Sequence, residues 1–542
     1  MNKIRKLTAL LLACTMIIAL AACGQNSSSN NNQSESTTSG SNSNNSAGNS
    51  STNDGSATKK DTLSIAISVD RGTLDPRNTQ AADIDGGLRM IYQNLWDWDE
   101  NSERIWVLAT GVEEVEPTRW IVNIREGVTF SNGNPLTASD VVFSLNLWNN
   151  RPGETPLIRL FDYENSRVID DYTCELAFSE YNAVYQNTLT NCYIFDQESF
   201  DPDTSAQVAI GTGPYVVSEY VVNSHLFLTA RDDYWGETPA IKNLEFRVLA
   251  EATQRVNALQ IGTVDISSIT PQDVEFVKSF PEYDTSSRTS SSISCIFFNV
   301  VEGTLFHKNT DARYAVAHAI DVDAIIRIAY NGLATRARMP GSMANTDIED
   351  RMLDLGIYDG NSYNPELARE YAEKAGLVGK EIRLITDPNP QRVMIAELLQ
   401  QNLREIGVEL SIRQIDQAAW VSSFFDPYTA DWDIGIDFMG TPNLLLARAY
   451  EDTLMRWLGG AYEIEEWPGR DRAKELYMGI MAIPNPADRS ERLYELNQIL
   501  VDALIWYSYC DTQTFLTYNK GLKDFAQARN RNGVVNYALL DW

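Results

Sequence analysis

Residues 211–266 constrain the fold of this chain more than any other stretch, because turn, strand and helix signals follow one another there. The run Gly211-Thr-Gly-Pro-Tyr predicts a turn, since glycine permits backbone angles closed to other residues and proline fixes its own φ. Strands are expected on both sides of Asn223 and, from alternating apolar residues, over 244–248. A helix over 252–261, ended by Gly262, leads into a strand over 264–266. This succession predicts an α/β domain.

A second informative run covers residues 125–145, REGVTFSNGNPLTASDVVFSL. Asn132-Gly133 predicts a turn, and Thr137 and Asp140 have the spacing of a helix N-cap and its N3 partner. Val141, Val142 and Leu145 then mark a buried helix face. We therefore expect tight turns followed by a well-capped helix, with no side chain assigned to chemistry.

Four motifs carry a family resemblance: GTGPY, the R-x-x-Y-W-G element from Arg231 to Gly236, A-L-Q-x-G-x-V-D ending at Asp265, and the run over 125–145. Together they resemble the extracellular solute-binding proteins, family 5, the substrate-binding lipoproteins of peptide- and nickel-type ABC importers. The resemblance covers nearly all of 61–542. It implies an α/β, two-lobed periplasmic-binding-protein-like fold (type II) with an extra α/β subdomain in the first lobe. The implied boundaries are 61–97 with 200–295 and 515–542 for lobe I, 98–199 for the extra subdomain, and 296–514 for lobe II.

The N-terminal pattern is typical of a targeting segment. Three basic residues within positions 3–6 precede an apolar run to Ala22, and Leu20-Ala-Ala-Cys23 places small residues before a cysteine. We predict a lipoprotein signal peptide over 1–22 and lipid attachment at Cys23; an ordinary secretory signal is the alternative. Residues 23–60 are rich in Ser, Asn and Gly and predict a disordered tether.

Charge and cysteine usage exclude several classes of partner. The net charge of −30 makes nucleic acid and anionic membrane poor partners, apart from the lipid anchor, and we attribute the acidity to solubility. No C-x-x-C motif occurs, so no zinc or redox site is predicted. Cys174 and Cys192 fall in one predicted lobe; isolated buried thiols are favoured, and a disulfide stays open.

Catalysis has little support in the sequence. With three histidines in the chain and no H-E-x-x-H, G-x-S-x-G or P-loop motif, most acid–base, metal and nucleophile schemes lack parts. His318, among apolar helix residues, is expected in the core. We predict no enzyme, no cofactor and no metal site; a secreted hydrolase is the alternative from another class.

The candidate ligand-binding residues come mainly from the resemblance. Trp420 follows a strand ending at Ile415, where the resembled peptide binders carry a ligand-contacting tryptophan. Asp437 ends a predicted strand over 432–438, and in α/β domains ligands bind at the carboxyl ends of strands. The loop after a Leu-Asp-Pro turn supplies two further candidates and the C-terminal strand-rich return one: Asn78, Thr79 and Tyr507.

The resemblance implies a binding protein on the extracellular face of a bacterial membrane. It would be a monomer that captures a solute by lobe closure and delivers it to an ABC permease. An oligopeptide is the first expectation. However, peptide binders of this family place an aspartate after the strand ending at Phe438, and residues 438–443, FMGTPN, lack it. An oligosaccharide or another small solute, including a metal chelate, therefore stays open.

Overall fold

The computed structural model describes residues 60–542 except 71, 79–84, 151–160, 429–430 and 441–443. The predicted signal peptide, Cys23 and nearly all of the tether lie outside these residues, as does Thr79. No helix in the described part of the chain combines the length and apolar character needed to span a bilayer.

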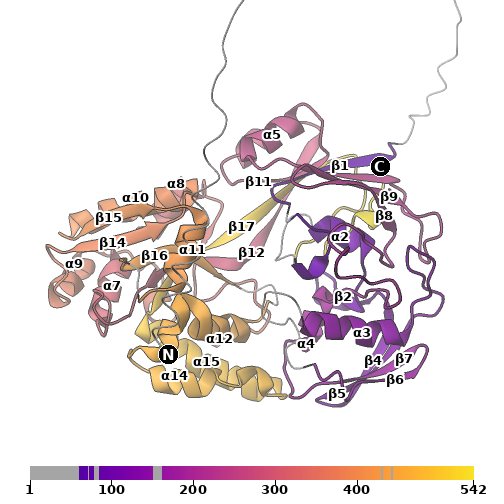
Figure 1. Ribbon diagram of the computed structural model, residues 1–542. Helices are drawn as coiled ribbons and strands as arrows, with labels where there is room; N and C mark the ends of the chain where they lie inside the picture. The colour runs from indigo at the N-terminus through magenta and orange to yellow at the C-terminus, as the bar shows by residue number, and fades with distance from the viewer. Residues whose placement is uncertain (1–59, 71, 79–84, 151–160, 429–430, 441–443) are drawn as a thin grey trace, which may run out of the picture. The chain divides into compact units, whose positions relative to one another are not determined.

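A mixed sheet, eleven-stranded in the described chain, organises the fold (Figure 1). Its long strands β12 and β17 pair antiparallel in the middle of the sheet, and β1 and β14 pair parallel with their neighbours. In spatial order the strands are β15 (Glu409–Gln414), β14 (Glu381–Thr386), β16 (Ile434–Gly440), β12 (Tyr283–Phe298), β17 (Trp506–Asn519), β11 (Ile266–Ile269), β1 (Thr62–Ile67), β10 (Asn243–Val248), β9 (His225–Ala230) and β8 (Tyr215–Val221), with β13 (Thr335–Arg336) beside β17.

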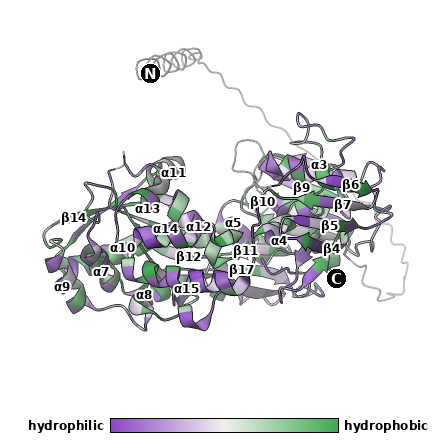
Figure 2. Cartoon of the chain, turned by 90° about the horizontal axis from the view of Figure 1, so that it is seen from below, coloured by the Kyte–Doolittle hydropathy of each residue, from purple (hydrophilic) through white to green (hydrophobic). Residues whose placement is uncertain are grey.

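Two large hydrophobic cores flank the long strands. One packs around the β14–β16 end of the sheet, with Trp432 and Trp506 fully buried in it. Its helices are α7 (Thr310–Ala319), α8 (Val322–Ala329), α9 (Pro365–Lys374), α10 (Pro390–Glu405), α11 (Gln417–Phe425), α12 (Leu446–Arg456), α13 (Ala461–Ile464), α14 (Arg470–Tyr477) and α15 (Pro486–Ala503). In Figure 2, hydrophilic and hydrophobic residues intermix along these helices. This is expected, because each helix buries one face against the core and exposes the other to solvent.

The other core packs around β1, β10 and the elements between residues 85 and 200. A four-stranded sheet and a short hairpin lie within this range, which includes the predicted extra subdomain: β4 (Ala109–Glu116), β5 (Arg119–Ile124), β7 (Thr173–Ala177) and β6 (Arg167–Asp170), with β2 (Trp96–Trp98) and β3 (Arg104–Trp106). The helices here are α2 (Asp85–Ile91), α3 (Ala138–Asn149) and α4 (Tyr185–Thr188), while α5 (Ala252–Gln260) and α6 (Val274–Val277) pack in a small third core. The domain boundaries stay a prediction.

The elements expected over 211–266 are present, except that the last strand covers Ile266–Ile269 rather than 264–266, and the reason for the two glycines differs from the expectation. Gly211 and Gly213 do not have positive φ. Instead, a Cβ on Gly211 would lie 2.1 Å from the carbonyl oxygen of Ile91, and one on Gly213 would lie 2.3 Å from that of Met90. Glycine is required by close approach of the turn to α2, not by backbone angle.

Arg231, the first residue of the R-x-x-Y-W-G element, explains why this motif accompanies GTGPY. Arg231 is 4% exposed, and its guanidinium group donates from Nη1 to the carbonyl oxygens of Thr129 and Gly213, and from Nη2 to that of Phe130. Three segments far apart in the sequence are thereby held together. The motif is structural.

Helix capping follows the sequence closely. Thr137 and Asp140 form the predicted capping box of α3, and Asn364 with Pro365 starts α9. Asp323, directly before Ala324, has the sequence position of a helix cap, but the cap of α8 is Asp321, whose side chain accepts from the backbone N–H of Ala324. Asp323 lies in the first turn, where a carboxylate also favours the helix dipole.

Cys174 and Cys192 are free and buried in the same core, as the favoured interpretation predicted. Burial raises the pKa of the Cys174 thiol to about 12, so it is unreactive near neutral pH. His318 is half-buried; its Nδ1 lies 2.7 Å from the carbonyl oxygen of Ser362, and its ring stacks on Tyr371. It is a core histidine, as expected.

Candidate solute-binding site

A cavity of about 260 Å³ lies where the carboxyl ends of β14 and β16 meet β12 and β17. The two short strands are parallel neighbours, with Leu384 opposite Ile434, so both carboxyl ends fall at one edge of the sheet. Continuing this register places Asp387 beside Asp437. Open α/β sheets bind ligands outside this edge.

Arg392 occupies the space between the two aspartates. Its Nη1 lies 3.1 Å from an oxygen of Asp387, and its Nη2 lies 2.7 Å from an oxygen of Asp437. The helix start fixes this position: Asn389 caps α10 by accepting from the backbone N–H groups of Gln391 and Arg392. Arg392 therefore stands in the first turn, directly after the carboxyl end of β14.

Aromatic rings flank the guanidinium group of Arg392. Its centre lies 5.5 Å from the ring of Trp420 and 4.9 Å from that of Phe438. Trp420 is 4% exposed and stacks on Phe424, with 4.9 Å between ring centroids, whereas Phe438 is 49% exposed. The indole Nε1 of Trp420 is buried without a hydrogen-bond partner among the described residues. Phe438 thus supplies the open aromatic surface.

The charged side chains that line the cavity, Arg392 and Asp437, form an ion pair with each other. Burial raises the pKa of Asp437 to about 7, while Arg392 lowers it and Asp387 raises it. The remaining lining groups are mainly hydroxyls and amides: Ser290, Ser292, Ser294, Tyr330, Thr512 and Gln513. Such a lining offers hydrogen-bond donors and acceptors to a polar ligand while its charges already pair with one another.

The predicted site residues are only partly brought together. Asp437 lines the cavity, and Trp420 contacts it through Arg392. Trp420 follows β15, as expected, and lies on α11. Asn78 is exposed beside Asp75, and Tyr507 is buried with its hydroxyl 2.6 Å from that of Ser362; neither lines this cavity. Their ligand contacts stay predictions.

The alternation of Trp432, Ile434 and Ile436 with Asp433 and Asp437 predicts that both aspartates lie on the face away from the core. Those three are buried, but so are both aspartates of the strand, at 1% for Asp433 and 8% for Asp437. Side chains on both faces of this segment are therefore covered. Each aspartate consequently has an arginine partner: Arg383 for Asp433 and Arg392 for Asp437.

Sequence reasoning missed Arg392, although a signal existed. Asn389-Pro390 marks a helix start directly after a predicted strand, and a charged residue in that first turn faces the sheet edge where ligands bind. Apolar spacing at Ala396, Leu399, Leu403 and Ile406 predicts a helix over 391–406, but it assigns no role to the first turn.

Comparison with known proteins decides the family. Residues 105–446 match the pattern of the bacterial extracellular solute-binding proteins, family 5. The chain belongs to this family. A family 5 protein binds solutes, so the coarse expectation of a binding protein rather than an enzyme agrees with the match.

The names of relatives in the family refer to different ligands. A Brucella ovis protein named for ABC-transporter peptide binding is 26% identical over 327 residues, which cover 58% of this chain and 60% of that protein. The oligopeptide-binding protein AppA of Bacillus subtilis is 24% identical over 65% of this chain and 68% of its own. The heme-binding protein A of Haemophilus influenzae is 25% identical over 59% of this chain and 64% of its own. The chain thus spans about 60% of the length of the first of these relatives.

Solved structures show the same fold. The substrate-binding protein CtaP of Listeria monocytogenes has a TM-score of 0.76 at 20% identity, over 89% of this chain and 99% of its own. AppA of Bacillus subtilis, in complex with a nonapeptide, has a TM-score of 0.74 at 17% identity, over 89% of this chain and 99% of its own. The predicted two-lobed, type II periplasmic-binding-protein fold is therefore confirmed.

Trp420→Ala is expected to weaken solute binding by about 1–3 kcal/mol. Trp420 is buried, so its role is not confined to ligand contact. We therefore also expect Trp420→Ala to lower the melting temperature. Trp420→Phe keeps a ring against Phe424, and Trp467→Phe is the control in the same core. Titration and thermal melts of the three variants separate the roles: normal affinity in both Trp420 variants would leave Trp420 a core residue.

Proposed function

We propose that the protein is the extracellular, membrane-anchored solute-binding component of an ABC importer. It captures its solute at the Asp437–Arg392 cavity as the lobes close and delivers it to a membrane permease. The observation that carries this proposal is the cavity itself, at the carboxyl ends of β14 and β16 and against the strands that run between the two cores. No catalytic step is required.

An oligopeptide is the solute we propose first. Hydroxyl and amide groups line the cavity, and they match the alternating N–H and C=O groups of a peptide backbone. The names of the Brucella and Bacillus relatives favour the same class.

An oligosaccharide is the second candidate, and the geometry gives it a specific reason. The carboxylate of Asp437 is already paired with Arg392, so this cavity offers no unpaired carboxylate from the described residues to a peptide ammonium group. A neutral, hydroxyl-rich ligand needs no such partner, and the exposed ring of Phe438 suits the apolar face of a sugar.

Peptides with and without a blocked N-terminus separate these candidates. We would screen matched free and N-acetylated oligopeptides, oligosaccharides, heme and nickel–histidine complexes by thermal shift, then titrate each hit. Free and acetylated peptides should bind within roughly tenfold of one another, because Asp437 is paired. Binding of oligosaccharides alone would replace the peptide proposal. Consumption of a bound ligand would instead support a hydrolase.

Cys23→Ser is expected to release the protein from membranes, since we propose that Cys23 becomes the acylated N-terminus. Lipid acylation supplies membrane affinity without a spanning helix. Fractionation of cells expressing each form measures this. Cys14→Ser is the matched control, because Cys14 lies within the predicted signal and leaves with it. A Cys23→Ser protein that stays with the membrane fraction contradicts the anchor.

A further inference from the structure

Three arginines converge where the C-terminal tail lies against β12. Arg288 Nη1 donates to the carbonyl oxygen of Asn530 at 2.9 Å, and Arg529 donates to the hydroxyl of Ser286. Gly533 lies between the two side chains: a Cβ there would stand 3.1 Å from Nη2 of Arg529 and 3.3 Å from Cδ of Arg288. Arg531 follows in the same tail loop.

None of these three guanidinium groups forms an ion pair with a described residue. This is unusual in a chain with 74 acidic and 44 basic residues. Glu100 acts on Arg288 and Arg529 at longer range, and Asp97 acts on Arg531. Asp97 is already engaged, because its Oδ2 accepts from Arg89 and Asn530 at 3.3 and 3.1 Å.

Burial makes the lack of anionic partners costly. Desolvation lowers the pKa of Arg288, Arg529 and Arg531, and repulsion by Arg288 lowers the pKa of the other two further. Arg531 is only 7% exposed, and its Nε has no hydrogen-bond partner in the described chain. A buried cation with unused donors is stabilised by an anion that accepts from them.

The ring of Trp98 lies beside this cluster. The guanidinium centre of Arg531 stands 5.0 Å from the ring, and that of Arg104 stands 5.2 Å from it. The Nε1 of Trp98 and the Nε of Arg104 are also buried without described partners. Unused N–H donors from β2, β3 and the tail therefore accumulate in one region.

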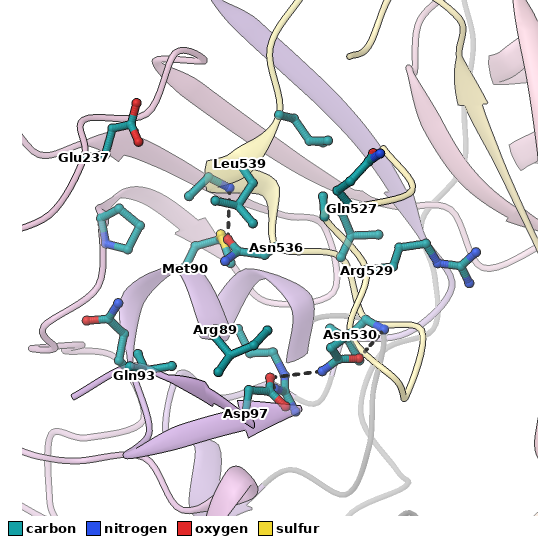
Figure 3. A pocket seen from close by; sticks show the side chains of 18 of the residues that line it. Arg89, Met90, Gln93, Asp97, Glu237, Gln527, Arg529, Asn530, Asn536 and Leu539 are labelled. Atoms are coloured by element: carbon teal, nitrogen blue, oxygen red, sulfur yellow. Dashed lines mark hydrogen bonds and ion pairs between the residues drawn. The ribbon is translucent and has the colours of Figure 1, made fainter. Parts of the chain in front are cut away.

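A cavity of about 570 Å³ is lined by Arg529 and Asn530, though not by Arg288 or Arg531, and is large enough for an organic ligand. Figure 3 shows Arg529 and Asn530 on one side of it and Gln93 on the other, with Asp97 and Arg89 at its base. Trp106, which is 38% exposed, and Trp235 add aromatic surface. This cavity shares no described lining residue with the Asp437–Arg392 cavity.

We propose that Arg288, Arg529 and Arg531 bind the carboxylate or phosphate group of an organic anion whose remainder occupies the adjoining 570 Å³ cavity. The planar forks of arginine match either group. The site is separate from the solute site, and the proposal stands whether or not the solute is a peptide.

Calorimetric titrations and thermal melts test this site directly. The probes are inorganic phosphate, glycerol 3-phosphate and succinate, each against sodium chloride at equal ionic strength. We expect saturable binding and a raised melting temperature with at least one probe. Response to the two phosphates alone assigns a phosphate group, and response to succinate alone assigns a carboxylate. No saturable response to any probe overturns the proposal.

Variants locate the binding. Arg529→Gln and Arg531→Gln should each weaken it at least tenfold, whereas Arg404→Gln, an exposed position on α10, should leave it unchanged. Arg531→Lys keeps the positive charge but lacks the planar guanidinium group, so it should retain part of the affinity. Partial binding in this variant shows that the weaker binding of Arg531→Gln is not caused by misfolding. Without anion, Arg531→Gln should melt no lower than the wild type. Unchanged binding in both glutamine variants would place the anion elsewhere and refute the site.

Discussion

Replacing Arg392 with methionine is expected to lower the free energy of unfolding by about 3–5 kcal/mol at pH 7 and to abolish solute capture. Methionine keeps the length of the side chain but leaves Asp387 and Asp437 without their cation. Asp437 is 8% exposed, so water cannot replace the lost partner. The aromatic contacts with Trp420 and Phe438 are lost as well.

The matched control for this prediction is Arg404→Met at the exposed end of the same helix, which should change stability by less than about 0.5 kcal/mol. Urea unfolding at about pH 7 and at about pH 5 measures both variants. Only a small part of the deficit of Arg392→Met should disappear at the lower pH, because Asp437, whose pKa is raised to about 7, is already about half-protonated at pH 7. Equal losses in the two variants would leave Arg392 a surface residue of no special importance.

Local structure was predictable where the sequence carries its own signals. The elements over 211–266, the capping box at Thr137 and the Asn364-Pro365 helix start depend on neighbouring residues, and all are present. The fold was identified through motifs because their spacing reflects contacts such as those of Arg231 with two turns. Contacts of this kind are invisible to periodicity.

The physical reason behind a residue was harder to predict than its presence. Glycine at 211 and 213 signalled a turn, but the carbonyl oxygens of α2 that exclude a Cβ come from more than a hundred residues away in the sequence. Similarly, alternation along 432–438 separated two faces correctly, yet it could not show that the second face of β16 is also covered. Both failures concern tertiary neighbours.

Part of the candidate site could be predicted from the sequence, and the rest depends on tertiary contacts that the sequence does not show. Asp437 follows from the rule that ligands bind at the carboxyl ends of strands, and Trp420 from the resemblance. Arg392 pairs with Asp437 across 45 positions, and no pattern within either segment marks that pairing. The sequence shows that the aspartate typical of the family's peptide binders is missing after Phe438. It does not show that Asp437 is paired with Arg392.

In Asp437→Asn, the free energy of unfolding is expected to fall less steeply with rising pH than in the wild type. In an unfolded chain an aspartate titrates near pH 3.9, whereas in the folded protein the pKa of Asp437 is raised to about 7. Between about pH 4 and 7 the folded state therefore holds a proton that the unfolded state has released. The free energy of unfolding falls as pH rises through this window, by at most about 1.4 kcal/mol per pH unit, and is level above it.

Asp511 supplies the comparison for this measurement. Burial raises its pKa to about 6, so it adds a similar slope that ends at lower pH. Urea unfolding from about pH 4 to 8 should show the wild-type decline and a shallower decline in Asp437→Asn. The curve of Asp511→Asn should differ from that of the wild type mainly below about pH 6. If Asp437→Asn leaves the curve unaltered, Arg392 keeps Asp437 ionised throughout. The solute would then meet a charged pair rather than a neutral carboxyl group, and ligands that carry charge would become the better candidates.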